Sequence, residues 1–198
     1  MKGTLRDVCG QDGLGLRRFK RYLTAFDRGT DCVEKGYYLE AIAILDSLIC
    51  DRLSSRLGYV LNQSIDLRLS CGQLCALLVG NHPTKGGGCE KDPDFRTVIG
   101  DIQRWVGRRN KALHATAKVL RSDDSQKDFA AILQSHKRDA ITGIKNLQTF
   151  DDLDTKSRAQ AGKRPASHPD AFFPERRSFQ VSTPDIGIRP RIKADGPI

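Results

Sequence analysis

The sequence predicts an all-α protein, an up-and-down helical bundle followed by a flexible basic tail. Apolar residues recur at three- and four-residue steps in five separate segments between residues 14 and 150, the spacing of one helix face. No segment alternates apolar and polar residues as a half-buried strand would. Six of the eight prolines stand in the last 34 residues, beyond the last of these segments.

The first two predicted helices lie before residue 58. The first covers residues 14–26, where one side is apolar and the other is basic. The second begins at Asp31, because Asp31 and Glu34 have the spacing of a capping box, and it runs to Leu57. This second segment has the clearest helical pattern in the chain. Its apolar residues are Val33, Tyr37, Tyr38, Ala41, Ile42, Leu45, Leu48, Ile49 and Leu53.

A third, shorter helix is predicted over residues 67–79, where Gly80 ends it. The following residues, 81–93, have the composition of a loop and include three consecutive glycines. Some glycine-rich loops bind phosphate, but this loop lacks the order G-x-x-x-x-G-K-[ST] of a nucleotide-binding loop. We therefore assign no phosphate site to it.

The last two predicted helices follow this loop. The fourth covers about 94–120, and a Ser-Asp-Asp turn at 122–124 separates it from the fifth. Apolar residues of the fifth helix extend from Phe129 to Leu147 at helical spacing. Short connections between such helices are typical of an up-and-down bundle.

Prolines and charges divide the chain into an N-terminal arm at 1–13, a bundle at 14–154 and a tail at 155–198. The tail contains nine Lys or Arg against four Asp or Glu and no sustained apolar pattern, so we expect it to be flexible. The whole chain has 198 residues and a formal charge of +9. This positive surplus favours an anionic partner such as nucleic acid or an acidic protein.

The sequence argues against several classes of protein and site. The longest apolar run, 74–79, is far shorter than the roughly 20 residues of a membrane-spanning helix. The first residues contain no apolar block of a secretory signal, so we expect a cytoplasmic protein with reduced cysteines and no membrane association. The six cysteines form no C-x-x-C pair, and a metal site at His82 and Cys89 would lack further ligands. No metal and no cofactor are predicted.

Polar residues interrupt the apolar face of the fourth helix. The gap between Val106 and Leu113 should be filled at position 109 or 110, but Arg109 and Asn110 stand there. A buried guanidinium must be satisfied, because an unpaired buried charge is costly. Either the arginine extends to the surface beside a bridging asparagine, or the two residues line a polar cleft. The apolar residues of this face are Ile99, Ile102, Trp105, Val106, Leu113, Ala117 and Leu120.

Helical geometry directs these polar residues to two sides. Asn110 and His114 are four residues apart and share a face, and Lys118 lies one turn further along it. Arg109 and His114 are five residues apart, so they point about 140° apart on an ideal helix. A long arginine side chain, a local distortion of the helix, or a symmetric homodimer in which the polar faces of two copies meet would bring both residue types to one site. We therefore expect a homodimer.

Residues 109–114 read RNKALH, which resembles the R-x4-6-H motif, often R-N-x-x-x-H, of HEPN domains. These domains are small helical bundles found in toxins, CRISPR effectors and antiviral systems. Residues 37–53 are similar to the long early helix of many HEPN proteins, and residues 69–74 resemble the L-x-x-G-Q-L opening of a middle helix in some of them. The resemblance covers about residues 14–150 and none of the tail.

The resemblance implies metal-independent RNA cleavage, in which the ribose 2′-hydroxyl attacks the adjacent phosphorus and leaves 2′,3′-cyclic phosphate and 5′-hydroxyl ends. His114 would transfer protons, since histidine titrates near neutral pH. Arg109 would hold the phosphoryl oxygens with its planar charged fork, and Asn110 would orient the imidazole or bind a phosphate or ribose oxygen. Such a protein would act as a toxin or in antiviral defence, with an antitoxin or activator protein as a further partner.

The remaining cations of the motif region have two interpretations. Arg108, Lys111 and Lys118 are either solvated surface charge or contacts to RNA phosphates that do not depend on base sequence. Two other functions for the chain also stay open. In the first, the chain is a non-catalytic HEPN-like module that binds RNA, a nucleotide or a protein. In the second, it is an interaction protein whose basic tail does the binding.

Overall fold

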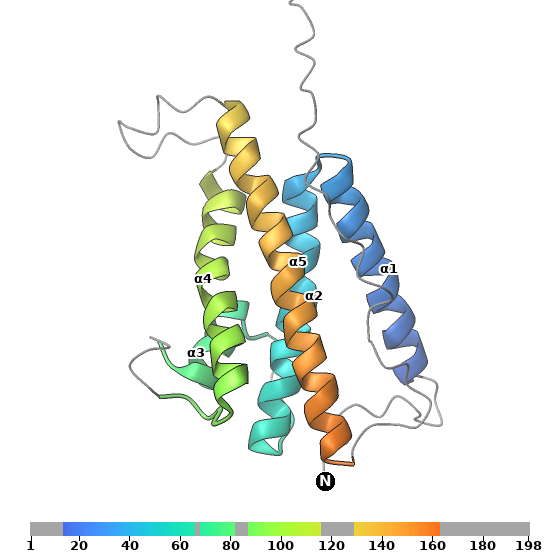
Figure 1. Cartoon of the computed structure of the whole chain (residues 1–198), viewed down its shortest axis with the longest axis vertical. Coiled ribbons are helices and arrows are strands. Elements are labelled where there is room, and N and C mark those ends of the chain that lie inside the picture. Colours follow the sequence, from blue (N-terminus) through green and yellow to red (C-terminus); the bar gives the residue numbers. More distant parts are fainter. Residues whose placement is uncertain (1–13, 66–67, 82–86, 116–128, 163–198) are drawn as a thin grey trace, which may run out of the picture.

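The computed structural model describes residues 14–65, 68–81, 87–115 and 129–162, and these residues form five helices and no strand. Figure 1 shows the four long helices side by side, with the direction of the chain alternating from one to the next, and the short α3 beside the lower half of α4. The predicted all-α bundle is confirmed. Its helices are α1 (Leu14–Glu34), α2 (Tyr38–Leu61), α3 (Cys71–Val79), α4 (Pro93–Ala115) and α5 (Phe129–Gln160).

Helix α2 lies at the centre of the bundle and contacts each of the other four helices. Its predicted apolar face is buried from Ala41 to Leu57, which explains why its pattern is the clearest in the sequence, whereas Tyr37 precedes the helix and is 57% exposed. On the opposite side of the core, Trp105 of α4 is fully buried, and its Nε1 donates to the Asp139 carbonyl at 2.7 Å. Gly143 of α5 makes room for the indole, because a Cβ there would lie 2.9 Å from the ring.

The break between α1 and α2 lies later than the sequence pattern predicts. Asp31 and Glu34 belong to the end of α1, so the predicted capping box is wrong. Gly36 adopts φ +83°, its N–H donates to the Val33 carbonyl, and the next N–H reaches the Cys32 carbonyl. This pair of bonds is a Schellman motif, which needs a residue that tolerates the left-handed region. A glycine after the acidic pair therefore sets this boundary.

Helix α3 begins later than residue 67, which itself lies outside the described residues together with residue 66. Ser70 caps the helix: its hydroxyl accepts from the Gln73 N–H at 3.3 Å, and the Gln73 side-chain oxygen accepts from the Ser70 N–H at 2.8 Å. This is a complete capping box, so residues 68–70 precede the helix and the predicted start is wrong. The predicted end at Gly80 is confirmed.

The described part of the loop after α3 is fastened to the bundle by hydrogen bonds and by one charged pair. The Arg96 guanidinium donates to the carbonyls of Gly87 and Glu90, each at 2.9 Å. Gly88 has φ +73°, and a Cβ there would overlap the Leu78 carbonyl, so this position requires glycine. The Glu90 carboxylate then turns inward and accepts from Arg56 Nε at 2.6 Å.

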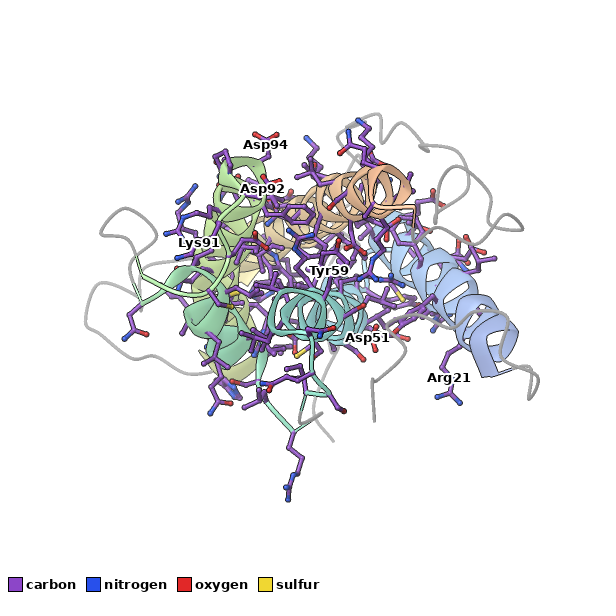
Figure 2. All side chains as sticks on the ribbon, turned by 90° about the horizontal axis from the view of Figure 1, so that it is seen from below. Arg21, Asp51, Tyr59, Lys91, Asp92 and Asp94 are labelled. Atoms are coloured by element: carbon purple, nitrogen blue, oxygen red, sulfur yellow. The ribbon has the colours of Figure 1, made fainter. Side chains whose placement is uncertain are left out.

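Charged residues form a buried seam along the lower half of α2, which we call the ionic seam. It consists of three pairs with N···O distances of 2.6–3.6 Å: Arg56–Glu90, Arg158–Asp154 and Arg52–Asp151. Figure 2 shows Tyr59 between α2 and α5, where the guanidinium carbons of Arg56 and Arg158 lie 5.2 Å and 5.1 Å from its ring centroid. Arg52 lies 4.7 Å from the ring centroid of Tyr22, so each positive charge has a carboxylate and an aromatic neighbour.

The bundle extends past its predicted end at Asp154, because the ionic seam includes a residue beyond that position. Helix α5 continues to Gln160, and the buried Arg158 donates to Ser55 of α2 at 3.1 Å. Residues 155–160 therefore belong to the bundle, not to the predicted tail. The arm 1–13, the predicted turn at 122–124 and residues 163–198 lie outside the described residues. No described helix is long and apolar enough to span a bilayer.

Candidate functional site

Arg109 lies in the apolar stripe of α4, as the sequence predicts. It is four residues from Trp105 and three from the buried Ala112, and only 13% of its side chain is exposed. The predicted return of the stripe at Leu113 is wrong, since Leu113 is 38% exposed and Ala112 takes the inner position. Arg109 is therefore a guanidinium held at the edge of the core, where it needs partners within hydrogen-bonding distance.

The chain itself supplies those partners. Arg109 Nη2 donates to Oδ1 of Asp46 on α2, and Nη1 donates to Oδ1 of Asn110 at 2.6 Å. Nε is buried without a hydrogen-bond partner. The Asp46 carboxylate cancels the charge of the guanidinium, as it would for a structural arginine. The sequence pattern did not reveal Asp46, because it lies 63 residues before Arg109 and on another helix.

The surroundings of Asp46 are largely shielded from water. Burial raises the pKa of Asp46 above its ordinary value, although Arg109 acts in the opposite direction. The nearby Cys50 thiol donates to the Leu69 carbonyl, and its contact with Cys71 together with burial raises its pKa well above the usual range. These thiols stay protonated and pack as small apolar groups, and the described cysteines are free.

Asn110 and His114 lie on the outer side of α4. Both are exposed and they are one helical turn apart, so they share one face. Arg109 makes no hydrogen bond with His114. A Cβ at Gly107, one turn before Asn110, would meet nothing within 4 Å, so this side of the helix is open. The structure thus brings Asn110 and His114 together and leaves Arg109 on the inner side.

The predicted phosphate-binding cations differ in what they contact. Arg108 Nε donates to Asp139 of α5 at 2.8 Å, so its charge is also paired with a carboxylate. Lys111 is exposed on the outer side of α4. Lys118 lies outside the described residues. Arg108 and Arg109 are therefore each paired with a carboxylate, although the Arg108 side chain is 46% exposed, and Lys111 is exposed as well.

A histidine that the sequence pattern did not single out lies close to this site. His136 of α5 is 4% exposed, its Nδ1 has no hydrogen-bond partner, and it lies one turn before Asp139. Burial lowers the pKa of His136, against the opposing charge of Asp139. A core histidine held neutral in this way contributes packing, and its charged form is disfavoured.

We expect acidification to destabilise the fold through His136. Its folded-state pKa lies below the ordinary 6.5, so between these two values the unfolded chain binds more protons. Its contribution to stability is present above pH 6.5 and is lost as the pH falls through the folded-state pKa. Urea unfolding at neutral and at mildly acidic pH measures this loss. The variant His136→Phe should show a smaller loss than wild type, and an equal loss would contradict the assignment.

Among the described residues, no group of three or more His, Cys, Asp or Glu has an arrangement that would hold a metal ion. No protein-family model matches the chain, and no curated protein and no solved structure gives a significant match. The functional interpretation therefore depends on the residues of α4 and their chemistry.

Proposed function

We propose that the protein is a metal-independent endoribonuclease that acts as a toxin or in antiviral defence. In the proposed reaction the ribose 2′-hydroxyl attacks the adjacent phosphorus, the 5′-oxygen leaves, and the products carry 2′,3′-cyclic phosphate and 5′-hydroxyl ends. One observation carries the proposal. An exposed histidine and an exposed asparagine share a face of α4 directly beside a guanidinium that interrupts the core. The resemblance of residues 109–114 to the HEPN motif supports the same reaction.

The residue types suit the steps of this reaction. His114 accepts or donates a proton near neutral pH, which both the attacking hydroxyl and the leaving oxygen require. Negative charge gathers on the phosphoryl oxygens in the transition state, and the amide of Asn110, which Arg109 contacts, can offset it. Lys111 and Arg108 would add affinity for the RNA backbone that falls with salt.

A homodimer would complete the site. Among the described residues, one chain offers a single exposed histidine at this face, whereas the reaction uses a base for the 2′-hydroxyl and an acid for the leaving oxygen. A second copy facing the first would supply the other His114. An antitoxin or activator protein that covers or exposes this face would then control cleavage.

The decisive experiment incubates the purified protein with end-labelled RNA in excess EDTA. We expect wild type to leave cyclic phosphate ends and His114→Ala to lose about 10²–10⁴-fold in rate, the usual contribution of a general acid or base. Arg109→Ala should also lose activity. Arg104→Ala is the matched control, because Arg104 is an exposed arginine of the same helix whose partner is Asp101. Equal cleavage by all variants, or activity abolished by EDTA, would refute the proposal.

A second candidate is a non-catalytic helical module that binds RNA, a nucleotide or a protein partner. The pairing of Arg108 and Arg109 with carboxylates favours it, because neither guanidinium is fully available to a phosphate. RNA binding without cleavage, unchanged in His114→Ala, would support this candidate. The tail as binding site is tested by deleting residues 163–198, since Arg158 belongs to the bundle. Loss of affinity on this deletion, with the bundle still folded, would place the binding site in the tail.

A further inference from the structure

A chain of two hydrogen bonds leads from α2 to the outer side of α4. The Asp46 carboxylate accepts from Arg109 Nη2, and Arg109 Nη1 donates to Asn110 Oδ1 at 2.6 Å. Arg109, in the middle of this chain, is the least exposed of the three at 13%, Asp46 is 26% exposed, and Asn110 is exposed. We call these residues the Asp46–Arg109–Asn110 relay.

The relay fixes the orientation of the Asn110 amide. A guanidinium has donors and no acceptor, so the group that faces Arg109 must be the amide oxygen of Asn110. The NH₂ group, on the other branch of the planar amide, then points away from Arg109. Asn110 shares its exposed face with His114, so the amide whose NH₂ group stays free of Arg109 belongs to the side where the proposed reaction takes place.

The same geometry argues against direct contact between Arg109 and a phosphate. Both of its terminal nitrogens already donate within the chain, and the side chain is only 13% exposed. A phosphate at Arg109 would lie beside the Asp46 carboxylate, whose like charge repels it in surroundings of low dielectric constant. Asn110, by contrast, is exposed and carries no competing charge.

We propose that Arg109 is a positioning residue, which orients Asn110 so that the Asn110 amide donates to a phosphoryl oxygen next to His114. This inference deepens the proposed ribonuclease function and rests on it for the identity of the ligand. It changes the role of the arginine from electrostatic clamp to support. It also adds Asp46, which the motif does not contain, to the residues on which the site depends.

A double-mutant cycle in the full chain tests the relay. Arg109→Ala and Asn110→Ala should each reduce cleavage about 100-fold, the typical effect of losing one transition-state donor. The double variant should lose no more than the larger single effect, because both substitutions remove the same contact. If Arg109 and Asn110 each bind the phosphate, the two losses multiply, and the inference is overturned. The pair Asn110→Ala and Lys111→Ala, two separate contacts, is the control for multiplied losses.

A measurement without RNA separates the inference from the proposed function. The side-chain amide of Asn110 gives its own pair of NMR signals, which should move in Arg109→Ala and stay in Arg104→Ala. Asp46→Asn keeps an acceptor for Arg109, so this variant should leave these signals near their wild-type positions. If the Asn110 signals keep their wild-type positions in Arg109→Ala, the relay is overturned. If the Asn110 signals move in Arg109→Ala but the protein does not cleave RNA, the ribonuclease function is rejected and the relay is supported.

Discussion

Arg56→Ala is expected to lower the free energy of unfolding by about 3–5 kcal/mol, the usual cost of removing one partner from a buried ion pair. The pair is well shielded, since the side chains of Arg56 and Glu90 are 5% and 3% exposed. Without Arg56, the Glu90 carboxylate keeps the N–H donors of Lys91 and Asp92 but loses its positive partner. The guanidinium also lies 3.5 Å from the ring centroid of Phe95, so the substitution empties space in the core.

Urea unfolding followed by the fluorescence of the single tryptophan measures this loss. The matched control is Arg28→Ala, which removes an exposed arginine from its pair with Glu40 at 2.8 Å. Exposed pairs contribute about 0–1 kcal/mol, so the control should remain close to wild type. Similar losses in both variants would show that the ionic seam is not shielded as described. A second variant, Glu90→Gln, tests the same pair from the other side without emptying the core.

Trp105→Ala should lower the free energy of unfolding by a similar amount, about 3–5 kcal/mol. The indole fills the contact between α4 and α5 and lies against Gly143, so its removal leaves a cavity that two rigid helices cannot close. Trp105→Phe keeps most of the volume and loses the hydrogen bond to Asp139. Its effect should therefore be smaller.

Circular dichroism at helical wavelengths measures both tryptophan variants, since the fluorescent group is the one replaced. Leu77→Ala serves as the control, because Leu77 is an apolar residue of α3 that is 48% exposed and should contribute little. An effect of Trp105→Ala as small as that of Leu77→Ala would mean that the α4–α5 contact contributes far less than its burial indicates.

The apolar pattern predicts the bundle because each helix buries one face, and periodicity records that face directly. The boundaries of the helices are harder to predict from the sequence, because a short local motif sets each of them. The spacing of Asp31 and Glu34 fits a capping box, yet Gly36 ends α1 two residues later. The true capping box, at Ser70 and Gln73, lies inside a segment whose apolar pattern already extends further toward the N-terminus.

The candidate site was predictable only where it depends on one helix. The shared face of Asn110 and His114 follows from their spacing, and the position of Arg109 in the apolar stripe follows from the gap in the pattern. Its partner Asp46 could not be found, because pairing between helices depends on how the helices pack. The same holds for two pairs of the ionic seam, because Arg52–Asp151 joins α2 to α5 and Arg56–Glu90 joins α2 to the loop after α3. The third pair, Arg158–Asp154, has the four-residue spacing of one helix face.

The pairing of α2 with α5 also has a consequence for the newly made chain. Ser55 and Arg158 are 103 positions apart in the sequence. Helix α2 can therefore pack against α5 only after most of the described chain has been synthesised. During that interval Arg52 lacks its partner Asp151, and the apolar side of α2 has only α1, α3 and α4 to cover it. The core of the bundle is therefore complete only once α5 has been made, and a chain interrupted before α5 would leave part of the apolar side of α2 exposed to water.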